Sequence, residues 1–172
     1  TILLFLLIAF YDSDCYTFYP GGTILDINVT AWNRIVSGTI QELRGIWGSS
    51  PTDIYAVGVY TLLHYDGNAW SSVNPDPAGG FTDVWGSSGS DVFVVGYAGK
   101  IWHYDGTGWS SMPSGKVTEL YGVWGASPTD VFAVGSSRTI LHYDGNSWSP
   151  MDPGTPLSIS LYDVWGSGPN DV

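Results

Sequence analysis

Histidine and aspartate recur together along this chain, and both residue types can ligate a metal ion or transfer a proton. Three such pairs are present: Asp53 with His64, Asp91 with His103, and Asp130 with His142. Each pair occupies the same place in a repeated unit, so the three histidines are expected on separate sheets, whereas a zinc ion needs all its ligands about 2 Å from one point. We therefore expect the histidines to pack or form hydrogen bonds and the aspartates to bind turn amides. No metal, cofactor or catalytic residue is predicted.

The unit that carries these pairs is marked by a tryptophan–glycine phrase that occurs four times. Its tryptophans are Trp47, Trp85, Trp124 and Trp165. A second phrase, His-Tyr-Asp-Gly, follows in three of the units and leads to another tryptophan. A repeat near 40 residues is typical of small structural units that must stack to bury their apolar faces. We expect Trp47, Trp85 and Trp124 in equivalent buried positions.

Each unit divides into four short strands, named A to D in chain order. In the third unit they are predicted at Leu120–Gly125, Val131–Gly135, Thr139–Tyr143 and Ser147–Met151. These runs are rich in β-branched and aromatic residues and are bounded by glycine, serine, proline and aspartate. No segment has a sustained period of 3.6 residues, so no helix is predicted. Strands A to C are apolar on both sides, which indicates sheets covered on both faces. The fold class is therefore all-β, a β-propeller of four-stranded blades and a piece of a larger ring.

The repeat also predicts the domain organisation. Full units cover residues 42–75, 80–113 and 119–152, and partial units cover 14–37 and 161–172. The two partial units can in principle form one composite blade, which would close a four-blade ring. We expect instead an open arc of three blades, with Trp32–Ser37 as an orphan D strand.

Residues 1–13 form an apolar segment of different character. Thr1–Phe10 is too short to span a bilayer but suits the apolar core of a secretory signal. The alternative is a degenerate strand A. We favour the signal remnant, which predicts a secreted or cell-surface protein. The single cysteine, Cys15, aligns with Val131 and is expected in the core.

Composition limits the classes of partner. The chain has five basic and sixteen acidic residues and a net charge of −11. This balance argues against binding to nucleic acid and to anionic membrane surfaces, because both attract basic patches. The aromatic content of 15% supplies large side chains for packing between blades.

Two phrases carry a resemblance to known proteins. Val123–Gly135 and Thr139–Trp148 resemble the units of highly repetitive β-propeller proteins from environmental bacteria, which are secreted or surface proteins. The units are also loosely similar to the Asp-box repeats of sialidases, although here the tryptophan follows Asp144 by four residues instead of five. The resemblance implies the fold and exposure to the outside of the cell, and it implies no reaction.

Departures from the repeat are the best candidates for a binding site, because a site normally breaks the symmetry of its repeat. In a propeller the D–A and B–C loops share one face, and four of the five basic residues fall in these loops. Tyrosines and alternating glycine and aspartate stand near the channel end of strand A. The candidate ligand-binding residues are Arg44, Asp83, Tyr97, Lys100, Tyr121, Arg138 and Asp163.

The function predicted from these features is a non-enzymatic binding module for glycans or proteins. Exposed tyrosines such as Tyr60, Tyr97 and Tyr121 can stack on sugar rings. One alternative is a purely structural spacer of a surface protein. A less favoured one is a glycoside hydrolase of the Asp-box type, which needs an acid–base carboxylate. No carboxylate pair stands out from the repeat, and the arginines Arg34, Arg44 and Arg138 occupy unrelated positions in their units.

Overall fold

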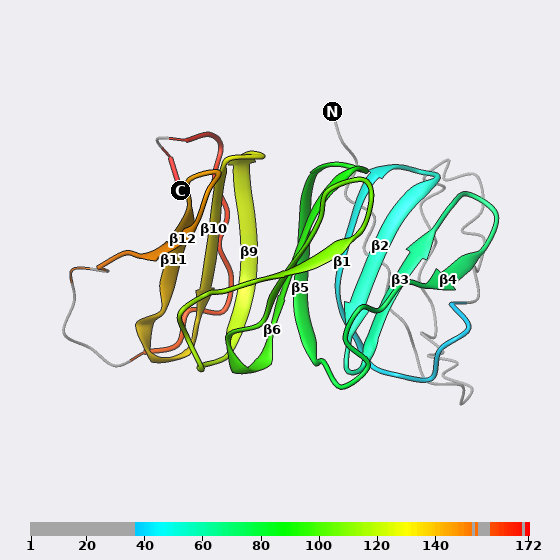
Figure 1. Cartoon of the computed structure of the whole chain (residues 1–172), viewed down its shortest axis with the longest axis horizontal. Coiled ribbons are helices and arrows are strands. Elements are labelled where there is room, and N and C mark those ends of the chain that lie inside the picture. The colour runs from blue at the N-terminus through cyan, green and yellow to red at the C-terminus, as the bar shows by residue number, and fades with distance from the viewer. Residues whose placement is uncertain (1–36, 153, 155–158, 170) are drawn as a thin grey trace, which may run out of the picture.

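The computed structural model describes residues 37–152, 154, 159–169 and 171–172, which form three four-stranded antiparallel sheets (Figure 1). In each sheet the strands lie side by side in chain order. The first sheet contains β1 (Leu43–Ser50), β2 (Asp53–Gly58), β3 (Thr61–Tyr65) and β4 (Trp70–Ser72). The second contains β5 (Phe81–Ser88), β6 (Asp91–Gly96), β7 (Ile101–Tyr104) and β8 (Trp109–Met112). The third contains β9 (Leu120–Ser127), β10 (Asp130–Gly135), β11 (Ile140–Tyr143) and β12 (Trp148–Pro150).

The all-β fold of four-stranded blades predicted from the repeat is confirmed. Its cores lie between neighbouring blades, where side chains from facing sheets meet. Tyr55, Val57 and Leu62 of the first blade pack against Phe81 and Val92 of the second. A corresponding cluster joins the second blade to the third. Because β6 lies between two other blades, its residues on both faces are buried, which explains its unbroken run of apolar residues.

The connections between strands B and C differ from blade to blade. In the first blade β2 and β3 are joined by Val59 and Tyr60. The later blades instead contain single 3-10 turns, η1 (Tyr97–Gly99) and η2 (Ser136–Arg138). These turns depart from the prediction of no helix. They arise because one additional residue enters the connection, which is too short to show any period in the sequence.

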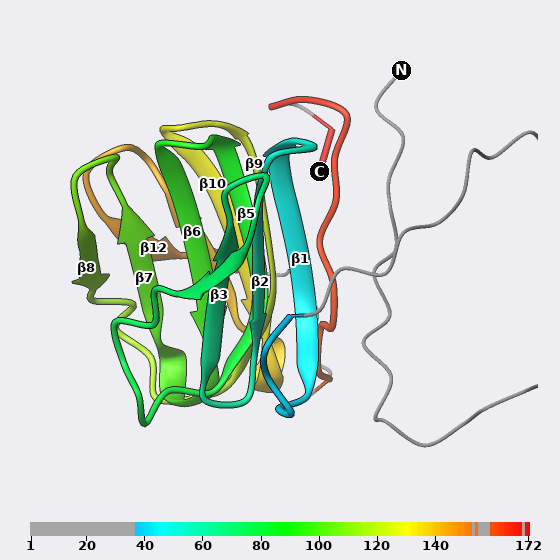
Figure 2. The same ribbon diagram turned by 90° about the vertical axis from the view of Figure 1, so that its right-hand side faces the viewer.

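The innermost strands β1, β5 and β9 lie on one side of the molecule, with β7 and β8 on the opposite side (Figure 2). Residues 159–166 continue this inner series beyond β9. The amide of Leu161 donates to the carbonyl of Gly135 at 3.0 Å, and a Cβ placed on Gly122 would lie 3.0 Å from the Cα of Asp163. Residues 159–166 form no strand, although they occupy the place of a strand A.

Each inner tryptophan packs on a glycine of the next inner strand. Trp47 lies on Gly86, and a Cβ at that glycine would stand 2.7 Å from its indole ring. Two further contacts repeat this one, Trp85 on Gly125 and Trp124 on Gly166. The three tryptophans are therefore equivalent, as predicted. They are half-buried, however, and not fully buried as expected.

Several predictions concern residues outside the described part of the chain. These are the apolar segment at 1–13, the core position of Cys15, the orphan strand starting at Trp32 and the expectation that the partial unit 14–37 does not close a ring. Within the described residues no helix is long and apolar enough to cross a membrane.

Candidate functional site

The recurrent histidines and aspartates form one pair within each blade. The Nε2 atom of the histidine lies 2.6 Å from the Oδ1 atom of its aspartate in all three pairs, Asp53–His64, Asp91–His103 and Asp130–His142. The histidine ring also stacks on an aromatic residue of strand B, as His103 does on Phe93 with centroids 4.2 Å apart. The pairs confirm that the histidines pack and form hydrogen bonds.

The prediction that the aspartates bind turn amides is wrong. Besides its histidine, Asp53 accepts a hydrogen bond from the hydroxyl of Ser49, and Asp91 accepts one from Ser87. Asp53 meets His64 because successive side chains of a strand point to opposite faces of the sheet. Asp53 lies two residues before Tyr55 and so shares its face, and Tyr55 is opposite His64 in the antiparallel register.

Serine, aspartate and histidine meet here in an order that does not suit nucleophilic catalysis. In a catalytic triad the histidine stands between the serine and the aspartate and takes the proton of the hydroxyl. Here the aspartate stands in the middle, and both the serine and the histidine form their hydrogen bonds with its carboxylate. In the third blade the serine is replaced by Ala126. In the described residues, moreover, no three His, Cys, Asp or Glu side chains are placed to hold a metal ion.

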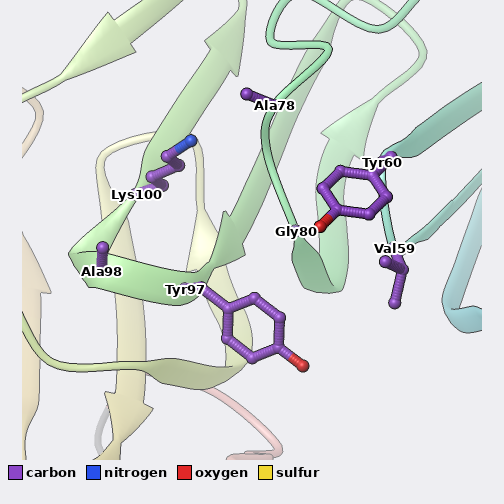
Figure 3. A pocket seen from close by; sticks show the side chains of 7 residues that line it. All are labelled: Val59, Tyr60, Ala78, Gly80, Tyr97, Ala98 and Lys100. Carbon is purple, nitrogen blue, oxygen red and sulfur yellow. The ribbon is translucent and has the colours of Figure 1, made fainter.

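A pocket of about 210 Å³ lies on the face formed by the B–C turns and the D–A connections. Figure 3 shows its lining, which comes from the first two blades and from the connection between them. The lining residues are Val59, Tyr60, Ala78, Gly80, Tyr97, Ala98 and Lys100. Two of the predicted candidates, Tyr97 and Lys100, are among them.

Tyr60 stands in an unusual backbone conformation at this pocket. Its φ is +56°, a region that costs a bulky L-residue about 1–2 kcal/mol, and 59% of the residue is exposed. The conformation is held by two hydrogen bonds. The amide of Tyr60 donates to the carbonyl of Gly79 at 3.0 Å, and its own carbonyl accepts from the side chain of Asn74 at 3.0 Å. Positive φ values also occur in the B–C turns of the later blades, at Ala98 and Ser137, so the strain belongs to the repeat, and what distinguishes Tyr60 is its large exposed ring.

The opposite wall is formed by Tyr97, whose ring lies directly against Gly80. A Cβ at this glycine would stand 2.3 Å from the ring, so only glycine allows the tyrosine to lie there. The guanidinium of Arg44 donates a hydrogen bond to the hydroxyl of Tyr97 and lies 5.2 Å from its ring centroid. Glu42 lies 3.3 Å from the same guanidinium. Arg44 thus orients the tyrosine from outside the pocket.

Lys100 completes the rim and is paired with an acid. Its Nζ lies 2.5 Å from Oδ2 of Asp76, and both side chains are partly buried. The charges near the pocket are therefore balanced within the protein, and the walls are mainly apolar and aromatic. Such a pocket can take an uncharged planar or apolar group.

The structure separates the remaining predicted residues from this pocket. Asp83 is partly buried, and its carboxylate accepts the amides of Val84 and Val123, both at 2.9 Å, so that it joins β5 to β9. Burial, reinforced by the nearby charge of Asp163, raises the pKa of Asp83 to about 6, although the two amide bonds oppose the shift. Asp83 is thus part of the framework between blades.

The other three candidates lie in the third blade and in residues 159–166 that follow it. Tyr121 stacks on Tyr162 with ring centroids 5.2 Å apart. Asp163 is exposed and accepts the amide of Val164 at 2.8 Å. Arg138 lies in η2, where its amide donates to the carbonyl of Ile159 at 2.8 Å. Of the seven candidates, the structure brings together Arg44, Tyr97 and Lys100.

Sequence reasoning missed the contribution of the connection between the first two blades. Asp76, Ala78 and Gly80 belong to it, and its sequence from Asn74 is Asn-Pro-Asp-Pro-Ala-Gly-Gly. Two prolines and two glycines in seven residues indicate a fixed loop instead of a solvated linker. That composition was a usable signal.

No known protein family matches the sequence of this chain, and no curated protein sequence is similar to it. Solved structures of the same fold do match. A structure of YCF48 bound to a D1 peptide aligns with a TM-score of 0.64 and 16% identity, over 81% of this chain and 49% of that chain. YCF48 from Cyanidioschyzon merolae aligns with a TM-score of 0.58 and 20% identity, over 73% of this chain and 44% of that chain.

An enzyme also shares the fold. An ancestral GH74 enzyme aligns with a TM-score of 0.57 and 12% identity, over 70% of this chain and 20% of that chain. The chain thus spans less than half the length of each of these structures. At such low identities the likeness shows the β-propeller architecture alone, and both binding proteins and an enzyme are found among the neighbours.

Proposed function

We propose that this chain is a non-enzymatic binding module of a secreted or surface protein, and that it binds an exposed segment of another protein. The observation that carries the proposal is the pocket between Tyr60 and Tyr97. Its volume of about 210 Å³ is below the roughly 300–1,000 Å³ of pockets that enclose a small molecule. It is of a size to take one apolar or aromatic side chain of a partner.

Two further observations support this function. One of the similar structures, YCF48, holds a D1 peptide, so a propeller of this architecture is compatible with peptide binding. The serine, aspartate and histidine that meet in the blades lack the order of a nucleophile and its base, which favours binding over catalysis. A glycan is the second candidate ligand, because the exposed ring of Tyr60 offers a flat surface on which a sugar can stack.

The test is a screen of the chain against a random peptide array and a glycan array, followed by calorimetry with the best ligand. Peptide hits that share an apolar or aromatic anchor are expected. Sugar hits without peptide hits would favour the glycan, and turnover of fluorogenic glycosides would contradict a non-enzymatic role.

Tyr60→Gly provides a sharp variant, because glycine removes the ring and relieves the positive φ together. We expect binding to fall at least about tenfold while the free energy of unfolding rises by about 1 kcal/mol. Ser137→Gly is the matched control, since Ser137 has φ +54° in the third blade and lies outside the pocket. It should gain similar stability and keep full affinity. Loss of binding in both variants would contradict the assignment of the site.

A further inference from the structure

The backbone that lines the pocket between Tyr60 and Tyr97 is already engaged in hydrogen bonds within the chain. The amide of Tyr60 donates to the carbonyl of Gly79 at 3.0 Å, and the carbonyl of Tyr60 accepts a side-chain amide at 3.0 Å. The amide of Tyr97 donates to the carbonyl of Gly80, also at 3.0 Å. The amide of Val59 is bonded at 3.1 Å to a carbonyl of the segment before β1. A partner chain that docks here therefore meets backbone that is already paired at these positions.

This pairing selects the kind of segment that can be buried in the pocket. A partner N–H loses its water when it docks, and an N–H left without an acceptor weakens binding by a factor of about five or more. Proline carries no N–H, and its ring fixes φ at about −65°. A proline-containing segment in the polyproline II conformation, which has no internal hydrogen bonds, thus avoids this loss.

The side walls present flat aromatic surfaces to such a segment. In Figure 3 the ring of Tyr60 and the ring of Tyr97 stand on two sides of the pocket, one from each blade. Tyr97 can lie there because Gly80 carries no side chain. Grooves lined by aromatic rings are a recurring binding surface for polyproline II segments. The hydroxyl of Tyr60 is a donor for the carbonyls of the segment, which are unpaired in this conformation.

The charges around the pocket are paired within the protein. Arg44 lies 3.3 Å from Glu42, and the Nζ of Lys100 lies 2.5 Å from Asp76. A charged residue of the partner would have to break one of these pairs, whereas proline is uncharged and leaves both intact. The paired charges therefore favour an uncharged segment, and its binding should depend little on salt.

The connection between the first two blades holds the pocket in shape before a ligand arrives. The side chain of Asn74 accepts the amide of Asp76 at 3.0 Å and donates to the carbonyl of Tyr60 at 3.0 Å. Asp76 in turn accepts the amides of Ala78 at 3.2 Å and Gly79 at 2.7 Å. A polyproline II segment is also ordered in its free state, so docking restricts little freedom on either side. Even a short segment is therefore expected to bind.

We propose that the ligand of this pocket is a proline-rich segment of a partner protein in the polyproline II conformation. One proline lies between the rings of Tyr60 and Tyr97, over Gly80. This inference rests on the proposed function, since it names the class of peptide that the binding module takes. It differs from a general apolar anchor in one respect, because the anchoring residue must lack an N–H.

Titration of the isotope-labelled 172-residue chain with capped hexaproline tests the proposal. The amides of Gly80 and Tyr97 should shift with peptide concentration, and the affinity should change by less than about twofold between about 0.05 and 0.5 M salt. Alanine at alternate positions of the peptide should weaken binding about tenfold, because it restores the N–H in every register. N-methylalanine at the same positions is the matched control. It restores no N–H and should weaken binding by less than about threefold.

Variants of the chain link this binding to the pocket. Tyr60→Gly should weaken hexaproline binding at least about tenfold, and Tyr60→Phe, which removes only the hydroxyl, about threefold. Ser137→Gly should bind like the unmodified chain, because Ser137 lies outside the pocket. Circular dichroism and thermal melts establish that the variants fold.

A second peptide separates this inference from the proposed function. A capped glycine–serine hexapeptide with one central phenylalanine offers an aromatic anchor and keeps its N–H groups. It should bind at least about tenfold more weakly than hexaproline. Tighter binding of this peptide at Tyr60 would overturn the proline assignment and leave the peptide-binding function standing. The proline assignment would also be overturned if hexaproline does not bind, if the alanine and proline peptides bind equally, or if Tyr60→Gly binds normally.

Discussion

The two faces of the blades are built from the same repeat but behave differently. On the face of the A–B turns, the aspartate–histidine distance is 2.6 Å in every blade. On the face of the B–C turns, the first blade has a two-residue turn with the exposed ring of Tyr60, and the later blades have longer 3-10 turns, although a residue with positive φ occurs in all three. The comparison indicates that the uniform face holds the blades in shape, whereas the variable face is free to acquire a binding site.

The largest effect on the free energy of unfolding is expected when alanine replaces one of two tryptophans that hold the same position of the repeat. Trp85→Ala should lower the free energy of unfolding by about 3 kcal/mol, because the indole covers Gly125 and packs against the core of the second and third blades. Trp165→Ala should change it by less than about 0.5 kcal/mol, because Trp165 is exposed. Urea unfolding of the monomeric chain measures both. Equal effects would contradict the repeated tryptophan–glycine contact.

The next effect concerns the pH dependence of stability. The folded state raises the pKa of Asp83 to about 6 from an ordinary value of 3.8, so the folded state binds more protons than the unfolded state between these values. Stability contributed by this group is present below about pH 4 and is lost as the pH rises through 6. The loss is up to about 3 kcal/mol for a shift of roughly two units.

Asp83→Asn removes this titration. Thermal melts from pH 4 to 8 should show that the difference in stability between the unmodified chain and Asp83→Asn falls as the pH rises and is constant above pH 7. Asp163→Asn is the matched control at the same position of the repeat and should keep most of the pH dependence. A difference that does not vary with pH would show that Asp83 is not in the environment described.

A smaller effect is expected from the aspartate–histidine pairs. Asp91→Ala leaves the ring of His103 and the hydroxyl of Ser87 without their shared acceptor and should cost about 1–2 kcal/mol. Asp130→Ala should cost less, because the third blade has Ala126 in place of the serine. Chemical denaturation provides the measurement. Neither variant should alter ligand binding at Tyr60, and a loss of affinity in either would contradict the separation of the two faces.

Much of the fold was predictable because the repeated units can be aligned with one another within the single sequence. The four strands of the third unit were expected within two residues of the bounds of β9 to β12. The aspartate–histidine contact was missed, since it depends on the register of β2 against β3. Asp83 was assigned to a ligand site, but its carboxylate binds the amide of Val123 about 40 residues away. The pattern of residues within one unit does not predict a contact with a residue so far along the chain.

The candidate site was predicted only in part for a related reason. Arg44, Tyr97 and Lys100 were chosen as departures from the repeat, and the structure brings them together. The pocket also needs Gly80, whose role follows from the position of the ring of Tyr97 above it. That position is set by the packing of two blades and cannot be read from the spacing of residues along one unit.

The most direct test of this account is to map a peptide from the array screen onto the isotope-labelled chain by the chemical shifts of its backbone amides. The account predicts that the largest changes occur at Tyr60, Gly80 and Tyr97, with little change at His64, His103 and His142. Changes centred on the histidines, or spread equally over both faces, would contradict the claim that the variable face carries binding.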